Sequence, residues 1–178
     1  AYIMYYGEIK KCDIANGTGV RVSLFVSGCT NKCKNCFQPE TWDFCYGQPF
    51  DEEARKIIFE ELERSYVAGI TILGGDPFEP RNQPEVLRLL KDIKSRFPAK
   101  TVWIFSGFRL DDELSVKGAY PNTEFTEEIL RLTDVLVDGR YVDELHDISL
   151  RFRGSSNQRI IDMNETRRAG KIILWDGF

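Results

Sequence analysis

The sequence predicts an α/β fold, a single-domain open partial (βα) barrel with a mainly parallel sheet. Apolar segments with the period of a strand alternate with segments that have the period of a helix. Strands joined by connections of helical length favour right-handed crossovers and parallel pairing. A complete eightfold barrel needs about 250 residues. The chain has 178 residues, so we expect residues 1–178 to form one domain that supplies only part of a barrel.

The first predicted strand ends where a cysteine-rich stretch begins. Apolar side chains recur there at the strand period of two, at Val20, Val22, Leu24 and Val26. Asn16-Gly17 suits a tight turn before this strand, and the strand ends at Gly28. The cysteine-rich stretch therefore forms a loop at the carboxyl end of a strand.

The next segments alternate between helical and strand patterns. Asp51 can cap a helix, because apolar residues follow it at helical spacing, at Ala54, Ile57, Ile58 and Leu62. Residues 69–73 are a short apolar strand that leads into Gly74-Gly75-Asp76-Pro77. The same alternation predicts two more helices, at 86–97 and 125–132. It also predicts two more strands, at 101–105 and 135–137.

The pattern weakens after residue 141. Residues 160–161 and 171–175 are candidate strands, and residues 153–157 are a candidate loop. The polar stretch 153–158 can either close over a cofactor or contact a protein partner. The sequence does not distinguish these two roles.

The composition is that of a globular protein that binds neither nucleic acid nor a membrane. Hydrophobic residues make up 42% of the chain and charged residues 29%, with a net charge of −4. The acidic balance and the scattered Lys and Arg residues do not favour binding to a polyanion. No stretch approaches the roughly 20 apolar residues that span a bilayer, and residues 1–11 do not resemble a signal peptide. We therefore expect the protein in the cytoplasm.

Three of the five cysteines are clustered in the sequence. Cys29, Cys33 and Cys36 form a CxxxCxxC loop, whereas Cys12 and Cys45 stand apart. Thiols of a cytoplasmic chain are normally reduced, so the cluster indicates metal binding or catalysis rather than disulfides. Thiolates suit iron–sulfur clusters and zinc. Three thiolates on a cubane cluster would leave one iron with an open position for a small molecule.

A zinc site is the alternative interpretation of the same cysteines. It would need a fourth ligand, for which Cys12, Cys45 and His146 are the candidates. For Cys12 and Cys45 themselves, we favour a role as small buried apolar residues. For His146, we favour a surface or structural role, because only acidic residues of ligand type lie near it in the sequence.

Four polar or glycine-rich segments each follow a predicted strand. They are the cysteine loop, Gly74-Gly75-Asp76-Pro77, Ser106-Gly107 and Asp138-Gly139-Arg140. The carboxyl ends of parallel strands lie at one edge of the sheet, where α/β proteins bind their ligands. We therefore expect all four segments to meet in one site.

The CxxxCxxC loop and the Gly-Gly-Asp-Pro turn resemble the motifs of the radical S-adenosylmethionine superfamily. Within it, the chain resembles the anaerobic ribonucleoside-triphosphate reductase activating proteins. The resemblance is carried by four stretches that together span most of the chain, DIANGTGVRVSLFVSGC, LGGDPFEP, DVLVDGRY and RGSSNQRII.

The resemblance implies a [4Fe-4S] cluster and an enzymatic function. Cys29, Cys33 and Cys36 would be the ligands and the catalytic residues, and the open iron would bind S-adenosylmethionine. The reduced cluster would cleave that cofactor to methionine and a 5'-deoxyadenosyl radical. This radical would take hydrogen from a glycine of an anaerobic ribonucleotide reductase, leaving a glycyl radical. A one-electron donor such as a flavodoxin would also be required.

Two other functions are compatible with the sequence. The substrate could be another glycyl-radical enzyme, such as a formate lyase. The chain could also be a non-enzymatic iron–sulfur or zinc binding module, which would need a fourth protein ligand but no Gly-Gly-Asp-Pro turn.

The resemblance also implies residues that bind the cofactor. Gly74 and Gly75 let the backbone approach the ligand closely. Asp76 would accept a hydrogen bond from the methionyl ammonium group, and Arg140 would bind the methionyl carboxylate in a bidentate manner. Ser106 and Asp138 are further candidates at strand ends.

The sequence departs from the superfamily pattern at two places. Asn35 stands before the third cysteine, where many members have an aromatic residue near the adenine, and Phe37 follows Cys36. We expect Asn35 and Phe37 to flank the cofactor, with a backbone hydrogen bond from this loop. Asp76 replaces the common Glu, which shortens the side chain but keeps its charge.

Overall fold

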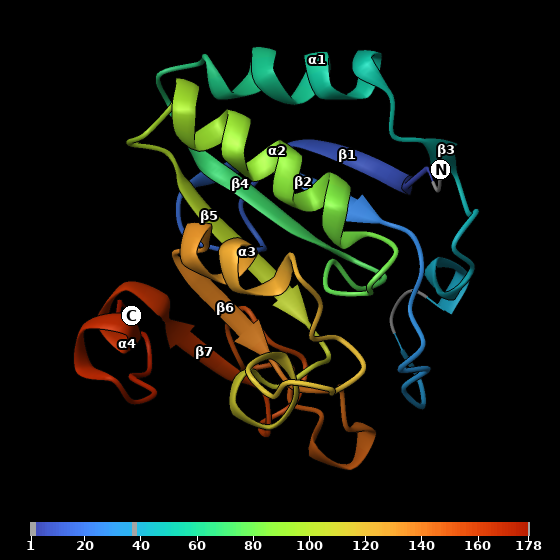
Figure 1. The fold of residues 1–178 in the computed structure, drawn as a ribbon, viewed down its shortest axis with the longest axis vertical. Coiled ribbons are helices and arrows are strands. Elements are labelled where there is room, and N and C mark those ends of the chain that lie inside the picture. Colours follow the sequence, from blue (N-terminus) through green and yellow to red (C-terminus); the bar gives the residue numbers. More distant parts are fainter. Residues whose placement is uncertain (1–2, 37–38, 178) are drawn as a thin grey trace.

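The computed structural model describes residues 3–36 and 39–177. Its seven strands form one sheet in the order β3-β1-β2-β4-β5-β6-β7 (Figure 1). The four central strands run parallel, whereas β1, β3 and β7 pair antiparallel with their neighbours. The strands are β1 (Tyr5–Asp13), β2 (Val20–Val26), β3 (Gln48–Pro49), β4 (Val67–Gly74), β5 (Thr101–Ser106), β6 (Val135–Asp138) and β7 (Arg159–Asp162).

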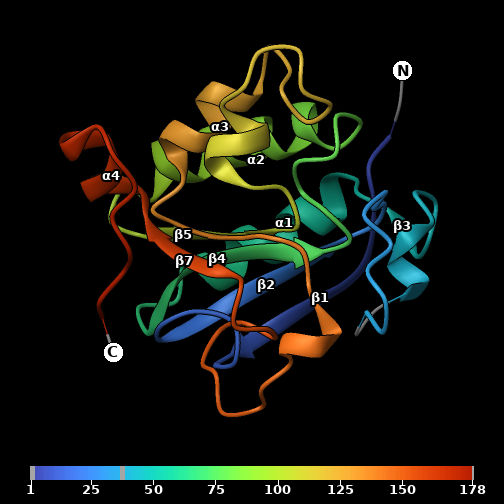
Figure 2. The ribbon, with the colours of Figure 1, turned by 90° about the horizontal axis from the view of Figure 1, so that it is seen from below.

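Helices cover one face of this sheet. Figure 2 shows α1, α2 and α3 on that face, the segment after β6 on the opposite face, and α4 beside β7. The α-helices are α1 (Glu52–Leu62), α2 (Gln83–Arg96), α3 (Thr126–Leu132) and α4 (Met163–Ala169). Short helical turns lie at Pro39–Trp42, Leu110–Leu114 and Asp143–Leu145. No helix in the described part of the chain is both long and apolar enough to cross a membrane.

The α/β alternation predicted from the sequence is confirmed. The predicted strands correspond to β2, β4, β5, β6 and β7, and the predicted helices to α1, α2 and α3. Asp51 caps α1 as expected, because its Oδ1 accepts a hydrogen bond of 3.0 Å from the Ala54 amide. The prediction of a strand at 171–175 is wrong, since this segment makes only one isolated bridge, between Leu174 and Ile161.

Three elements were not predicted, namely β1, β3 and α4. β1 has the sequence YYGEIKKCD, in which charged residues interrupt the apolar pattern and only Asp13 is buried. β3 has only two residues, both exposed. The α4 sequence MNETRRA buries only Met163. These elements therefore lack the strong hydrophobic periodicity on which sequence reasoning depends.

The main core lies between the helices and the sheet. Of the helical residues predicted as core, Leu62, Val86, Leu90 and Ile93 are buried there. Ile57, predicted with them, is only half-buried, and its neighbour Ile58 enters the core instead. A second, smaller cluster on the other face surrounds Trp103 of β5. The rings of Phe152 and Trp175 each meet Trp103 edge to face, with centroids 5.3 Å apart. This aromatic cluster attaches the C-terminal segments to the sheet.

Arg21 joins three strands at their amino ends. Its guanidinium is fully buried and donates hydrogen bonds to Thr71 Oγ1 at 2.9 Å, to Thr101 Oγ1 at 2.9 Å and to the Ile70 and Thr101 carbonyls at 2.9 and 2.8 Å. Burial lowers the pKa of Arg21 to about 10, against the opposing charges of Asp134 and Asp13. The side chain thus ties β2 to β4 and β5.

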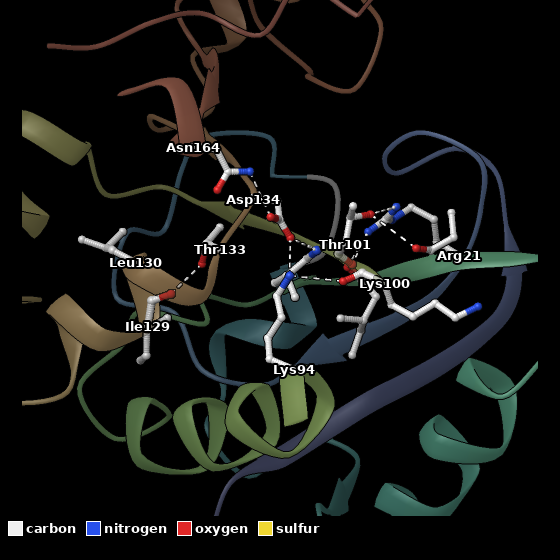
Figure 3. Close-up of polar contacts among 12 residues, drawn as sticks. Arg21, Lys94, Lys100, Thr101, Ile129, Leu130, Thr133, Asp134 and Asn164 are labelled. Atoms are coloured by element: carbon white, nitrogen blue, oxygen red, sulfur yellow. Dashed lines mark hydrogen bonds and ion pairs between the residues drawn. The ribbon is translucent and has the colours of Figure 1, made fainter. Parts of the chain in front are cut away.

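Asp134 connects helices and strands beside this group (Figure 3). Its Oδ2 accepts hydrogen bonds of 2.8 Å from both Lys94 Nζ on α2 and the Val102 amide on β5. Its Oδ1 accepts a bond of 3.1 Å from Asn164 Nδ2 on α4. One carboxylate therefore satisfies donors from three elements.

We expect Asp134→Ala to lower the free energy of unfolding by about 1–3 kcal/mol, because partly buried donors would lose their acceptor. Asp112→Ala is the matched control, since Asp112 makes an exposed ion pair with Arg109 and should change stability by less than about 0.5 kcal/mol. Urea unfolding of the two variants measures the difference. Equal stabilities would contradict this role for Asp134.

Candidate functional site

A cavity of about 680 Å³ lies at the carboxyl ends of the parallel strands. These ends are level, because Val26 pairs with Gly74 and Ser106 pairs with Asp138. Seven of the predicted site residues line the cavity, namely Cys29, Cys33, Cys36, Gly74, Gly75, Asp76 and Ser106. The expectation that the strand-end segments meet in one site is therefore confirmed for these residues.

The cysteine loop begins at a very close contact between two backbones. The Asp76 amide donates a hydrogen bond of 2.8 Å to the Gly28 carbonyl, and the Gly75 amide donates one of 2.7 Å to the Val26 carbonyl. A Cβ on Gly75 would lie 2.5 Å from the Gly28 oxygen. Gly28 itself has a φ of +104°, which disfavours other residues. Glycine at both positions lets the two loops share hydrogen bonds.

A segment not identified from the sequence flanks the other side of Gly28. The Gly28 amide donates to the Thr41 carbonyl at 2.7 Å, and the Cys29 amide donates to the Trp42 carbonyl at 3.3 Å. The Phe44 ring fills the space in which a Gly28 side chain would stand. Thr41 and Trp42 also line the cavity. The backbone at the start of the cysteine loop is thus held from both sides.

Asp76 is a fully buried carboxylate in this site. Its Oδ1 accepts hydrogen bonds from the Phe78 amide at 2.9 Å and from Ser106 Oγ at 2.8 Å. Its Oδ2 accepts bonds from the Gly107 amide at 2.9 Å and from Asn31 Nδ2 at 3.1 Å. Burial raises the pKa of Asp76 to about 7, although the hydrogen bonds oppose this rise. Asp76 therefore connects the ends of β4 and β5 with the cysteine loop.

Burial also affects the thiols of the cysteine loop. It raises the pKa of Cys29 to about 12, while hydrogen bonds from Asn31 and Lys32 to the sulfur oppose the rise. It raises the pKa of Cys33 as well, against a hydrogen bond from the Tyr141 amide. A metal would have to displace these protons, because the thiolate is the ligand.

The donor set fits an iron–sulfur cluster. Within residues 3–36 and 39–177, no three His, Cys, Asp or Glu side chains gather closely enough to hold a single metal ion. A cubane cluster is wider than one ion and takes each thiolate on a different iron. The three thiols line a cavity whose volume is typical of sites for small molecules. The cavity therefore brings together thiols of the kind that bind a cluster and has room for a small molecule.

Two predicted residues near the end of β6 do not line the cavity. Asp138 is fully buried and accepts hydrogen bonds from Arg159 Nε at 2.9 Å and from the Leu110 amide at 2.7 Å. Arg140 makes a bidentate ion pair with Glu113, at 2.9 and 2.7 Å. Their charges are thus already paired with other side chains of this chain.

The two predicted residues that flank Cys36 have different outcomes. Asn35 does not line the cavity, and its Nδ2 donates a hydrogen bond of 2.9 Å to Asp143 Oδ2. Phe37 lies outside the described residues. The Asn35 contact joins the cysteine loop to the segment that follows β6.

The remaining cysteines and the histidine also have defined places. Cys12 and Cys45 are exposed, so the expectation that they are buried apolar residues is wrong. Cys12 lies at an irregularity of β1 and has a φ of +56°. Neither Cys12 nor Cys45 lines the cavity. His146 does line the cavity, together with Tyr141 and Phe152 from the segment after β6. This wall has no periodic pattern in the sequence, and only its polar stretch 153–158 indicated a role near the cofactor.

Comparisons with known proteins agree with this site. A family model described as "4Fe-4S single cluster domain" matches residues 15–161. The anaerobic ribonucleoside-triphosphate reductase-activating protein of Enterobacteria phage T4 is 38% identical, over 88% of this chain and 93% of its own length. The protein of that name from Escherichia coli K12 is 38% identical, over 87% of this chain and 96% of its own length. The protein of that name from Pasteurella multocida is 39% identical, over 89% of this chain and 95% of its own length.

The matches cover the strand-end cavity and most of the sheet around it. The identities and the shared lengths are those of one family rather than of a common motif. The chain therefore belongs to the family of anaerobic ribonucleoside-triphosphate reductase-activating proteins.

Proposed function

We propose that residues 1–178 act as a single radical S-adenosylmethionine domain. The protein cleaves S-adenosylmethionine reductively and uses the product to take a hydrogen atom from a glycine of an anaerobic ribonucleoside-triphosphate reductase. The observation that carries this proposal is that the three cysteines of the loop line one cavity together with Gly74, Gly75 and Asp76. The names of the relatives favour this reductase over a formate lyase as the substrate.

Cys29, Cys33 and Cys36 would hold a [4Fe-4S] cluster with one open iron. When bound, the cluster supplies the electron for the cleavage and a coordination site for the methionyl group. The chain itself holds the loop in place through the paired backbones of Gly28 and Gly75. This arrangement holds the backbone that leads into Cys29.

Gly74, Gly75, Asp76 and Ser106 would bind the methionyl end of the cofactor. The two glycines leave the edge of β4 open to a ligand, because no side chain covers the backbone there. Asp76 would orient the ammonium group, since a carboxylate accepts charge-assisted hydrogen bonds. Ser106 holds Asp76 through its 2.8 Å hydrogen bond and would therefore act partly through that carboxylate.

Arg140 and Asp138 would serve the other side of the site. The charge of Arg140 acts on Cys33 and Asp76, which both line the cavity, and we propose that its guanidinium attracts the methionyl carboxylate. Binding of the cofactor would compete with Glu113 for that guanidinium. Asp138 would fix the turn that carries Arg140, because it is held by Arg159 and by the Leu110 amide. We propose for Asn35 and Phe37 a place beside the adenine, with Asn35 acting through its backbone.

The substrate glycine would reach the cavity from the unclosed side of the sheet. We propose that the four parallel strands act as an open partial (βα) barrel, whose second wall is the segment 146–154. A large protein partner would cover this opening and exclude water and other hydrogen donors. A one-electron donor such as a flavodoxin would reduce the cluster, and the cytoplasm would keep the thiols reduced.

The proposed function is tested by anaerobic reconstitution with iron and sulfide, followed by incubation with S-adenosylmethionine and a strong reductant. Formation of 5'-deoxyadenosine supports it. One equivalent of zinc per chain, with no brown colour after reconstitution, would instead support a zinc-binding module.

We expect Cys29→Ala, Cys33→Ala and Cys36→Ala each to abolish retention of the cluster and cleavage of S-adenosylmethionine. Each replacement leaves only two loop thiolates, whereas a [4Fe-4S] cluster with one open iron needs three. Cys12→Ala and Cys45→Ala are the matched controls, because both thiols are exposed and lie outside the cavity. Iron analysis and 5'-deoxyadenosine assays measure the outcome. Loss of the cluster in Cys45→Ala would indicate a four-ligand site.

We expect Arg140→Ala to weaken binding of S-adenosylmethionine by about ten- to a hundredfold, because a charge-assisted hydrogen bond contributes about 1.5–3 kcal/mol. The iron content should stay near normal, since Arg140 is not proposed to bind iron. Arg88→Ala is the control, as Arg88 forms exposed ion pairs with Glu52 and Glu85. Equilibrium binding to the reconstituted protein measures the change. Equal affinities for Arg140→Ala and the wild type would assign Arg140 to its ion pair with Glu113 alone.

We expect a stable glycyl radical only when the reductase is present, and slow cleavage of S-adenosylmethionine by the activating protein alone. The reason is that the open cavity is completed by the partner. Electron paramagnetic resonance of the anaerobic mixture detects the radical as a doublet. The reductase with its candidate glycine replaced by alanine is the control, and a doublet that persists there would place the radical on another residue.

A further inference from the structure

A second buried carboxylate, Glu79, lies close to the cysteine loop and has no place in the function proposed so far. Its side chain is fully buried in the turn between β4 and α2. The backbone around it is rigid, because the Glu79 amide donates to the Asp76 carbonyl at 3.1 Å and its carbonyl accepts from the Asn82 amide at 2.8 Å. Glu79 therefore presents its carboxylate from a fixed position.

Three donors converge on this carboxylate. Glu79 Oε1 accepts hydrogen bonds from both the amide and the hydroxyl of Thr30, at 2.7 and 2.6 Å. Glu79 Oε2 accepts a bond of 2.7 Å from the Tyr120 hydroxyl. Burial, followed by the bond to Glu79, raises the pKa of Tyr120 to about 12, so Tyr120 keeps its proton and acts as a donor. All three bonds suit an ionised carboxylate, which only accepts.

The contact with Thr30 decides where the following backbone points. Thr30 is the residue directly after Cys29, and the amides of Asn31 and Lys32 then turn back to donate to the Cys29 sulfur. Lys32 adopts a φ of +47°, a conformation that a non-glycine residue keeps only when its neighbours hold it. Glu79 provides such a hold at the beginning of the turn.

We propose that Glu79 is a positioning residue for Cys29, which fixes the Thr30 turn and thereby sets the reactivity of the thiol and the reduction potential of the cluster bound to it. The part of this proposal that concerns the reduction potential rests on the proposed function, whereas the part that concerns the thiol does not. Hydrogen bonds to cluster sulfurs and nearby charges both tune the potential of an iron–sulfur centre. Glu79 acts through both, since it orients two amides and carries a negative charge.

The first test uses the full chain before cluster reconstitution and measures the alkylation rate of each cysteine by mass spectrometry. We expect Glu79→Ala to accelerate alkylation of Cys29 about tenfold, because release of the turn exposes the sulfur to the reagent. The exposed Cys12 and Cys45 are internal controls whose rates should not change. Glu79→Gln should react like the wild type, since its amide oxygen still accepts from Thr30.

The second test is a redox titration of the reconstituted cluster, followed by electron paramagnetic resonance. Glu79→Gln keeps the shape of the side chain and removes its negative charge, so the reduced cluster should become more favourable. We expect the ratio of reduced to oxidised cluster at a fixed potential to rise about tenfold, which is about 59 mV for one electron. Glu61→Gln is the matched control, because Glu61 is a buried carboxylate on α1 that binds Arg64.

An unchanged alkylation rate of Cys29 in folded Glu79→Ala would overturn the positioning role. If Glu79→Ala does not fold, the titration of Glu79→Gln decides, and a potential equal to that of the wild type overturns the proposal. The alkylation test needs no cluster and no S-adenosylmethionine. Its result therefore stands even if the proposed enzymatic function fails.

Discussion

The close contact between the backbones of Gly28 and Gly75 is the constraint on which the site depends. The hydrogen bond from the Asp76 amide to the Gly28 carbonyl joins the start of the cysteine loop to the turn after β4. Any side chain at Gly75 would force these loops apart. Cys29 and Asp76 are the next residues on either side of this contact, so the distance between thiol and carboxylate is set by main-chain geometry.

The amino ends of the parallel strands stabilise the fold, whereas their carboxyl ends form the site. At the amino ends, Arg21 and Asp134 satisfy donors and acceptors from several elements, and their groups are fully paired. At the carboxyl ends, glycines leave the backbone open around a cavity and two buried carboxylates face the cysteine loop. Burying these carboxylates at the carboxyl ends lowers the stability of the fold, because a charged group loses its hydration when it is buried. The paired amino end and the helix-covered core offset that cost.

The parallel strands, the helices that cover them and the cavity residues on three strand ends were predictable from the sequence, because each has a strong period or an unusual motif. The pairing of Arg140 with Glu113 and of Asp138 with Arg159 was not predictable, since a charge pattern does not tell which distant residue supplies the opposite charge. Nor was the role of Glu79, whose burial depends on how the turn after β4 meets the cysteine loop. Such contacts come from tertiary structure alone.

The distribution of the three tryptophans gives the molecule built-in optical reporters. Trp103 and Trp175 belong to the aromatic cluster beneath the sheet, with ring centroids 5.3 Å apart, whereas Trp42 stands in the wall of the cavity. Rings this close couple their near-ultraviolet transitions, so the circular dichroism of the pair reports on docking of the C-terminal segment. An iron–sulfur centre in the cavity would quench the fluorescence of nearby tryptophans, including Trp42 in the cavity wall. Near-ultraviolet circular dichroism thus follows docking of the C-terminal segment on the sheet, and tryptophan fluorescence follows binding of a cluster in the cavity.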